Sequence, residues 1–247
     1  MTAHVAPIAL DFEEGIDRKT LRRLRDRFLL VNQQRWSRAH SALSYRQQMV
    51  LEILPLVFHL NHPALPGYLD SDCPYGLNDY KPSFATINAA RRLARTFTLK
   101  DEGKRKPGLD AMFLMGSPGT LGHSVASDLD VWLCHRNDLP ERGIRCLERK
   151  AEKLARWAEA LGVELHVFVF CASDWRAGRQ RAEVTGENCG SAQHFLLLDE
   201  FYRTSIHLAG AWPMWWLIPA EQEASYDDCM RKLVDCRFVR ADDYIDF

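Results

Sequence analysis

The sequence lacks the features that mark several classes of protein. Positive charge is not in excess, since 32 Lys and Arg residues stand against 33 Asp and Glu residues. Composition therefore gives no indication of a nucleic-acid partner. No apolar run approaches the length of about 18 residues that a membrane-spanning helix needs. The first ten residues also lack the charged and apolar pattern of a signal peptide, so we expect neither a transmembrane segment nor export.

Cysteine pairs at metal-binding spacing are missing as well. The chain has seven cysteines and no CxxC motif, which argues against a structural zinc site. An odd number of cysteines, several of them inside apolar runs, is typical of reduced thiols. The sequence therefore predicts a cytoplasmic protein without disulfide bonds.

What the chain does carry is a polar motif between two apolar runs. The first run ends in Gly116-Ser117, and after ten intervening residues Asp128-Leu129-Asp130 opens the second. Residues i and i+2 of a strand share a face, so the two carboxylates project together and repel each other. A divalent cation relieves that repulsion, and oxygen ligands suit Mg²⁺ or Mn²⁺. The motif predicts a metal site on Asp128 and Asp130, with Gly116 and Ser117 binding phosphate oxygens.

This spacing resembles the signature of the nucleotidyltransferases related to polymerase beta. The resemblance implies an α+β fold, in which a mixed sheet is flanked by helices, and a third carboxylate on the strand after Asp-x-Asp. Residues 163–170 alternate as a strand, and Glu164 is the residue at the position of that carboxylate. His166 shares its face and competes for the role. A glutamate that faces water from an edge strand is the alternative interpretation of Glu164.

Two longer blocks resemble the class I adenylate cyclases, the bacterial enzymes that make cyclic AMP from ATP. Residues 115–135 are similar to the first signature block of that family. Residues 186–210, which include Asp-Glu-Phe-Tyr-Arg-Thr at 199–204, are similar to the second and far more specific one. Further similarity lies in the opening part of the chain, at 29–35, 54–63 and 65–68. Family members are much longer, so the resemblance implies that this chain is the front of the catalytic region and that regulatory proteins act through a C-terminal region absent here.

Periodicity and turn residues predict the organisation of the chain. Residues 16–60 have helical spacing, and the Pro- and Gly-rich loop 61–82 follows them. We expect a helical N-terminal segment over 1–80 and a nucleotidyltransferase-like core over 81–247 that is incomplete at its C-terminus. Further helices are expected at 83–97 and 140–161 and within 187–209. The last of these is expected to pack deeply through Leu196 and Leu197.

The function implied by the resemblance is the conversion of ATP to cyclic AMP and pyrophosphate. The ribose 3′-hydroxyl attacks the α-phosphorus, with Asp128 and Asp130 holding the metal ions and Glu164 assisting. The same motif also permits transfer of a nucleotidyl group to an external hydroxyl, or a truncated module that binds nucleotide without turnover.

Arg203 is the remaining candidate for contact with the substrate. It is the one strong cation of the second signature block, and it lies four residues after Asp199. A residue pair at that spacing on a helix is close enough for an ion pair. The sequence therefore leaves two roles open for Arg203, which are binding to phosphate and pairing with Asp199.

Overall fold

A four-stranded mixed sheet forms the centre of the computed structural model, which describes residues 17–99, 107–120, 128–179 and 191–247. The strand order is β3-β2-β1-β4. The strands are β1 (Leu109–Met115), β2 (Leu129–His135), β3 (Leu165–Phe170) and β4 (Ile206–Gly210). β1 runs antiparallel to β2 and β4, whereas β2 and β3 are parallel. The expected α+β class with a mixed sheet is confirmed.

Helices precede the sheet in the sequence, as the periodicity predicts. They are α1 (Arg18–Ala42), α2 (Tyr45–His59) and α3 (Phe84–Leu93). Ser44 and Ser83 are the N-caps of α2 and α3, and each side chain accepts a hydrogen bond from a backbone N–H of the first turn. No helix in the described part of the chain has the length and apolar character needed to cross a membrane.

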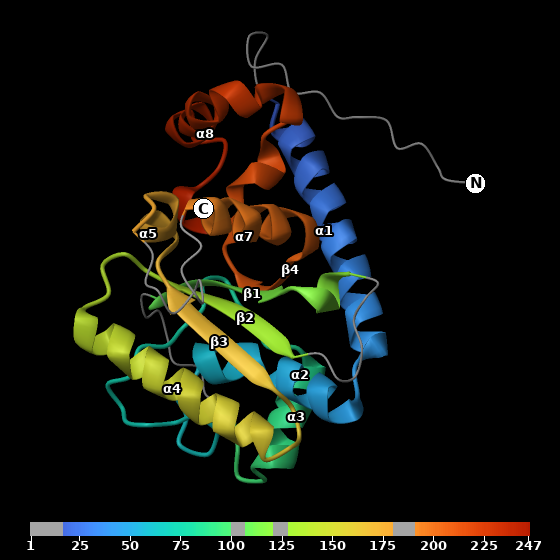
Figure 1. Ribbon diagram of the computed structural model, residues 1–247, viewed down its shortest axis with the longest axis vertical. Coiled ribbons are helices and arrows are strands. Elements are labelled where there is room, and N and C mark those ends of the chain that lie inside the picture. The colour runs from blue at the N-terminus through green and yellow to red at the C-terminus, as the bar shows by residue number, and fades with distance from the viewer. Residues whose placement is uncertain (1–16, 100–106, 121–127, 180–190) are drawn as a thin grey trace.

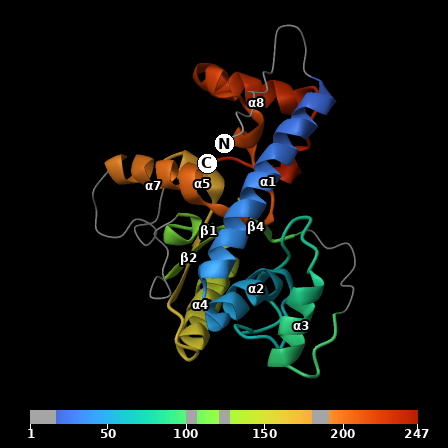
Figure 2. The ribbon, with the colours of Figure 1, turned by 90° about the vertical axis from the view of Figure 1, so that its right-hand side faces the viewer.

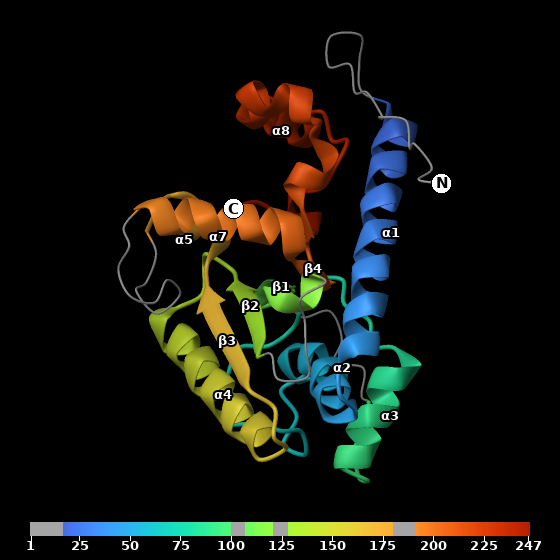
Figure 3. The ribbon, with the colours of Figure 1, turned by 45° about the vertical axis from the view of Figure 1, so that its right-hand side comes forward.

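One face of the sheet is covered by α2, α3 and α4 (Glu141–Glu159), which lie together in Figures 1 and 3. α4 is also the crossover that joins the parallel strands β2 and β3. Buried apolar side chains from both parts of the chain meet here, including Leu54 of α2, Leu114 of β1 and Leu154 of α4. The described residues on the two sides of position 80 therefore share a hydrophobic core, and the division into units at 1–80 and 81–247 stays a prediction.

The opposite face carries an aromatic cluster beneath α7 (Ser191–Thr204) and α5 (Ala172–Arg176). The rings of Trp132 and Phe201 stack with centroids 5.3 Å apart and an interplanar angle of 6°. Phe247 packs against Phe201 with a centroid distance of 4.5 Å. The C-terminal residue thus returns to the sheet (Figure 1).

The last part of the chain forms α8 (Tyr226–Asp235), which lies beyond α7 in Figure 3, and then returns to the aromatic cluster. It also contains a short parallel pair formed by β5 (Trp212–Pro213) and β6 (Tyr244–Ile245). Short 3₁₀ helices connect these elements at Met214–Leu217, Ala220–Ser225 and Ala241–Asp243. α1 runs along one side of the molecule from α8 to α2 (Figure 2).

The helix expected within 187–209 is shorter than predicted. α7 ends at Thr204, and the following residues form the edge strand β4, which pairs with β1. The deep packing predicted for Leu196 is wrong, because its side chain is 69% exposed, while Leu197 is only partly buried. Phe201 is the fully buried anchor of the helix.

Candidate active site

The turn after β1 brings the backbone close to two carboxylates. Gly116 has φ 72° and ψ −143°, a conformation that L side chains rarely adopt. A Cβ atom built on Gly116 would lie 3.7 Å from Oε1 of Glu200 and 3.9 Å from Oδ2 of Asp130. The half-buried Ser117 begins the 3₁₀ helix Ser117–Gly119 that follows. The predicted Gly-Ser turn therefore lies beside the predicted Asp-x-Asp strand.

Strand pairing places the two aspartates of the motif. In the antiparallel register Asp130 lies opposite Met115, the residue before Gly116. Leu129 and Val131 are fully buried in the core of the other face, while the side chains of Asp128 and Asp130 are half-buried. The shared face predicted for the two carboxylates follows from this alternation.

The parallel strand β3 adds a third carboxylate and an imidazole. His166 is the register partner of Asp130, and the backbone N–H of Leu129 donates to the carbonyl oxygen of Glu164 at 3.0 Å. One ligand atom each from Asp128, Glu164 and His166 lies within 4.8 Å of the other two. His166 Nε2 is 3.3 Å from Glu164 Oε1. Both residues that competed for the third position therefore lie at the site.

Glu200 is a site residue that the sequence analysis missed. It is on α7, and its carboxylate reaches the sheet end beside Gly116. Burial, followed by the charges of Asp128, Glu200 and Glu164, raises the pKa of Asp130, and nearby His166 opposes that rise. The only signal in the sequence was the position of Glu200 within the second signature block.

Arg203, the predicted phosphate ligand, forms an ion pair within its own helix. Its Nε donates to Oδ1 of Asp199 at 2.7 Å, and the two side chains are 75% and 59% exposed. The pairing alternative is therefore realised. Contact between Arg203 and phosphate stays a prediction that requires this exposed pair to open.

The donor set at the end of the sheet fits a divalent cation. Four carboxylates converge there, and three of the residues offer ligand atoms close enough for one ion to contact together. Carboxylate oxygens suit Mg²⁺ and Mn²⁺, and the crowding that raises the pKa of Asp130 is relieved by positive charge. Asp128 and Asp130 are the predicted ligands, and the geometry adds Glu164 and His166 to the candidates.

Comparison with known proteins identifies a single family. The model described as "Adenylate cyclase NT domain" matches residues 20–216. An adenylate cyclase of Escherichia coli strain K12 is 36% identical over 225 residues, which are 90% of this chain and 26% of that protein. The adenylate cyclase of Pasteurella multocida is 35% identical over 86% of this chain, and that of Yersinia intermedia is 33% identical over 90%.

These relatives are much longer than the present chain, which spans only 26% of their length. No solved structure matches the chain. The family match covers β1, β2, β3, α7 and β4, and with them every residue of the candidate site. The chain therefore belongs to the family of adenylate cyclase N-terminal domains.

Proposed function

We propose that the chain carries the catalytic centre of a class I adenylate cyclase, built on a nucleotidyltransferase fold of the polymerase-beta kind. The reaction converts ATP to 3′,5′-cyclic AMP and pyrophosphate. The observation that carries the proposal is the meeting of the Gly116-Ser117 turn with Asp128, Asp130 and Glu164 at one end of the sheet. The strand order supports the fold assignment, because β2, which carries Asp-x-Asp, lies between β1, which leads into the Gly-Ser turn, and β3, which follows Glu164.

The acidic residues are proposed to bind Mg²⁺ or Mn²⁺ and so to position the 3′-hydroxyl and the phosphates of ATP. Asp128 and Asp130 are the proposed metal ligands, and Glu164 assists them. Asp128 shares a candidate metal cluster with Glu164 and His166. Asp130, whose pKa is raised by burial and then by the charges of neighbours that include Asp128 and Glu164, is assigned to the ion as the neighbour of those two residues. A bound divalent cation acidifies the attacking 3′-hydroxyl and neutralises charge on the leaving pyrophosphate. The paired strands β2 and β3 set the backbone positions of these carboxylates, which favours a site that is organised before the substrate binds.

The turn after β1 supplies the proposed contacts to the outer phosphates. Gly116 has no side chain to keep a phosphate from the backbone, and Ser117 offers its N–H and its hydroxyl. Arg203 lies three residues from Glu200 on α7 and is the proposed cationic contact, once it leaves Asp199.

Transfer of the nucleotidyl group to an external hydroxyl is the second candidate function. The side chains of Glu164 and His166 are 70% and 47% exposed, which leaves room for an acceptor from solution. The two reactions differ only in which hydroxyl reaches the α-phosphorus. A third possibility is a module that binds nucleotide without turnover, because the chain spans 26% of its relatives' length.

We also propose a cytoplasmic setting. The six cysteines in the described part of the chain carry free thiols, as reducing conditions would keep them. Regulatory proteins are proposed to act outside residues 1–247, in the part of the relatives that this chain does not match.

Incubation of the chain with ATP and Mg²⁺ or Mn²⁺, followed by chromatography of the products, tests these possibilities. Cyclic AMP with an equal amount of pyrophosphate supports the cyclase, and a nucleotidyl adduct supports the transferase. Binding of ATP without any product supports the inactive module. Absence of both binding and product would contradict all three.

Asparagine variants locate the activity in the proposed centre. Asp128→Asn and Asp130→Asn should each lose more than about 90% of the rate, a loss of at least about 1.4 kcal/mol in transition-state stabilisation. Asp235→Asn, which changes an exposed aspartate at the end of α8, is the matched control and should keep the wild-type rate. A variant of Asp128 or Asp130 with more than a tenth of the rate would remove that residue from the metal site.

A further inference from the structure

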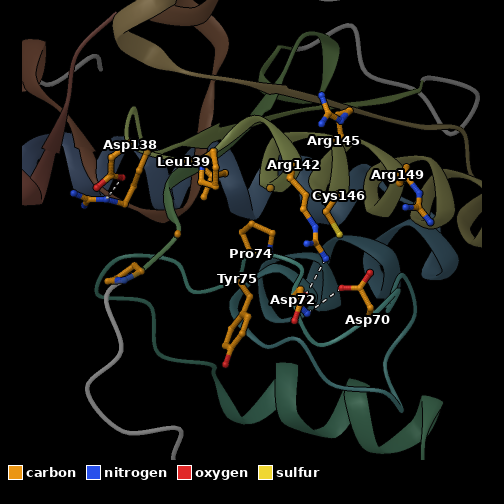
Figure 4. Close-up of a pocket in the computed structure, with 15 residues that line it drawn as sticks. Asp70, Asp72, Pro74, Tyr75, Asp138, Leu139, Arg142, Arg145, Cys146 and Arg149 are labelled. Atoms are coloured by element: carbon orange, nitrogen blue, oxygen red, sulfur yellow. Dashed lines mark hydrogen bonds and ion pairs between the residues drawn. The ribbon is translucent and has the colours of Figure 1, made fainter.

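A cavity of about 660 Å³ lies at the end of β2 that is remote from the candidate active site. Its walls are the loop 70–75, the residues that follow β2 and the first turns of α4 (Figure 4). β2 has seven residues, and at about 3.3 Å a residue its two ends are roughly 20 Å apart. A molecule in this cavity would therefore leave the active site free.

Arginine dominates the charge of the cavity. Arg142, Arg145 and Arg149 line it from α4 with a spacing of three and four residues, which places them on one side of the helix. Arg136, from the segment after β2, is the fourth. Three carboxylates share the wall, those of Asp70, Asp72 and Asp138. The lining thus has four positive and three negative side chains.

The three arginines of α4 are exposed, whereas Arg136 is paired with Asp138 at 3.2 Å and with Asp110 at 3.9 Å. Arg142 pairs with Asp72 at 3.0 Å, but the side chains are 82% and 68% exposed, and such surface pairs exchange readily. Arg145 pairs with Glu141 in the same exposed way. Arg149 makes no ion pair or hydrogen bond with the described residues. Figure 4 shows Arg142 directed into the cavity toward Asp72.

We propose that this cavity binds a small phosphate monoester that carries hydroxyl groups. Guanidinium groups bind phosphate oxygens through paired N–H donors, and Arg142, which Figure 4 shows directed into the cavity, is the proposed first contact once it leaves Asp72. Arg149 lines the same cavity further along α4, and the double charge of a phosphate monoester suits several such cations better than the single charge of a carboxylate ligand. Asp70 and Asp72 are acceptors for hydroxyl donors of the ligand. The volume is in the range of small-molecule sites.

The carbon skeleton of such a ligand also finds a surface. Pro74 and Leu139 form apolar parts of the wall, and Tyr75 adds an aromatic ring with a polar end. The mixed lining favours a polar metabolite over an apolar one, because arginine and aspartate side chains surround the apolar patch. Ribose 5-phosphate has the required phosphate and hydroxyl groups and is a suitable probe.

Cys146 gives a readout confined to the cavity. It lines the cavity and is half-buried, whereas Cys236 is exposed at the end of α8. The rate of alkylation by iodoacetamide is measured for each cysteine by peptide mass spectrometry. Ribose 5-phosphate should slow the reaction of Cys146 by about tenfold at saturation and leave Cys236 unchanged, while ribose should protect neither. Absence of protection at millimolar ribose 5-phosphate, or equal protection by ribose, would overturn the proposal.

Two variants on α4 separate the cavity from general surface charge. Arg149→Gln should raise the ribose 5-phosphate concentration for half-protection by about tenfold, since a charged donor to phosphate is lost. Arg156→Gln, seven residues further on the same helix and outside the cavity, should leave it unchanged. Equal effects of both variants would contradict a specific site. If Cys146 does not react in the free protein, calorimetric titration with ribose 5-phosphate and the same two variants decides.

Discussion

Gly116 lies beside two of the carboxylates of the candidate site. The oxygens of Glu200 and Asp130 would be 3.7 and 3.9 Å from an added Cβ atom, which are ordinary contact distances. A methyl group therefore fits the space, and the difficulty for alanine is the φ of 72°. The demand for glycine here comes from the backbone, which turns the chain from β1 toward the 3₁₀ helix.

We predict that Gly116→Ala lowers the free energy of unfolding by about 1–3 kcal/mol through backbone strain and also impairs turnover, because the turn shifts relative to Asp130. Urea unfolding and product chromatography measure the two effects. Gly178→Ala is the matched control, since Gly178 has φ 68° with nothing within 4 Å of an added Cβ. It should lose comparable stability while keeping the activity. Loss of activity in both variants would mean that instability alone explains the effect of Gly116→Ala.

Arg203 and Asp199 allow the two roles of the arginine to be separated. If the arginine only pairs with Asp199, Arg203→Ala and Asp199→Asn should each lower stability by about 0.3–0.5 kcal/mol and leave turnover intact. If Arg203 reaches phosphate, Arg203→Ala should lower turnover by orders of magnitude, whereas Asp199→Asn should not. We expect the second pattern, and equal rates in the two variants would contradict it. Steady-state rates and urea unfolding provide the measurements.

At the scale of the element, α7 has a buried side and an exposed side that we expect to contribute very differently to the free energy of unfolding. Phe201 is fully buried and contacts Trp132, Phe113 and Phe247. Phe195, six residues earlier, is 67% exposed. Among the described side chains of α7, Phe201 therefore makes the main contact with the sheet, with Leu197, Leu198 and Tyr202 packed beside it.

We predict that Phe201→Ala lowers the free energy of unfolding by about 3–5 kcal/mol, the range for truncation of a buried aromatic ring. Phe195→Ala, the same chemical change on the exposed side, should alter it by less than about 0.5 kcal/mol. Chemical denaturation with a common slope for the variants gives both values. A small effect of Phe201→Ala would show that α7 does not need the aromatic cluster to stay on the sheet.

Elements with their own local signal could be predicted from the sequence, and elements defined by distant partners could not. The Gly-Ser turn and the Asp-x-Asp strand have adjacent apolar runs that fix their faces. β4 was missed because its residues continue an apolar helical pattern, and its strand character depends on pairing with β1. Gly210 is required by that pairing, because a Cβ atom at this position would clash with the carbonyl oxygen of Asp110 in β1.

The same reasoning explains what was missed in the site. Asp128, Asp130 and Glu164 are close because adjacent strands bring them together, and strand alternation is visible in a sequence. Glu200 reaches them only because α7 crosses the sheet face. A sequence pattern does not show which helix residue will lie beside which strand residue, so this contact could not be predicted. The pairing of Arg203 with Asp199 was open from spacing alone, and the structure shows it.

At the scale of the whole molecule, the edge strand β4 joins the sheet to α1 and to the aromatic segment that follows. The side-chain amide of Asn32, on α1, makes two hydrogen bonds to the backbone of His207. Its Nδ2 donates to the carbonyl oxygen of His207 at 3.0 Å, and its Oδ1 accepts from the backbone N–H of His207 at 2.8 Å. The imidazole of His207 stacks on Trp212, with ring centroids 4.0 Å apart, and its Nε2 lies 3.1 Å from the carbonyl oxygens of Gly210 and Ala211. The backbone of His207 thus bonds to α1, and its buried ring packs against the segment that follows β4.

The environment of His207 makes the stability of the whole molecule sensitive to acid. Burial lowers the pKa of His207 to about 4 and outweighs the two backbone carbonyls, which raise it. An unfolded chain titrates its histidines near pH 6.5. Between these values the unfolded state binds a proton that the folded state does not, so the free energy of unfolding falls as the pH falls from about 6.5 to about 4.

We predict that this single group removes on the order of 3 kcal/mol of stability across that pH range, given its depressed pKa of about 4. Above pH 6.5 both states hold a neutral ring and the contribution vanishes.

His207→Gln keeps a side-chain donor but no titrating ring, so its stability should be lower at pH 7 and depend less on pH. Urea unfolding of both proteins at pH 7, 6, 5 and about 4 gives the difference in their free energies of unfolding. The contribution of the carboxylates to the pH dependence is common to both proteins and cancels in this difference. Parallel curves for wild type and His207→Gln would contradict the assignment, because a ring with a pKa of about 4 in the folded state and near 6.5 in the unfolded state must make the free energy of unfolding depend on pH.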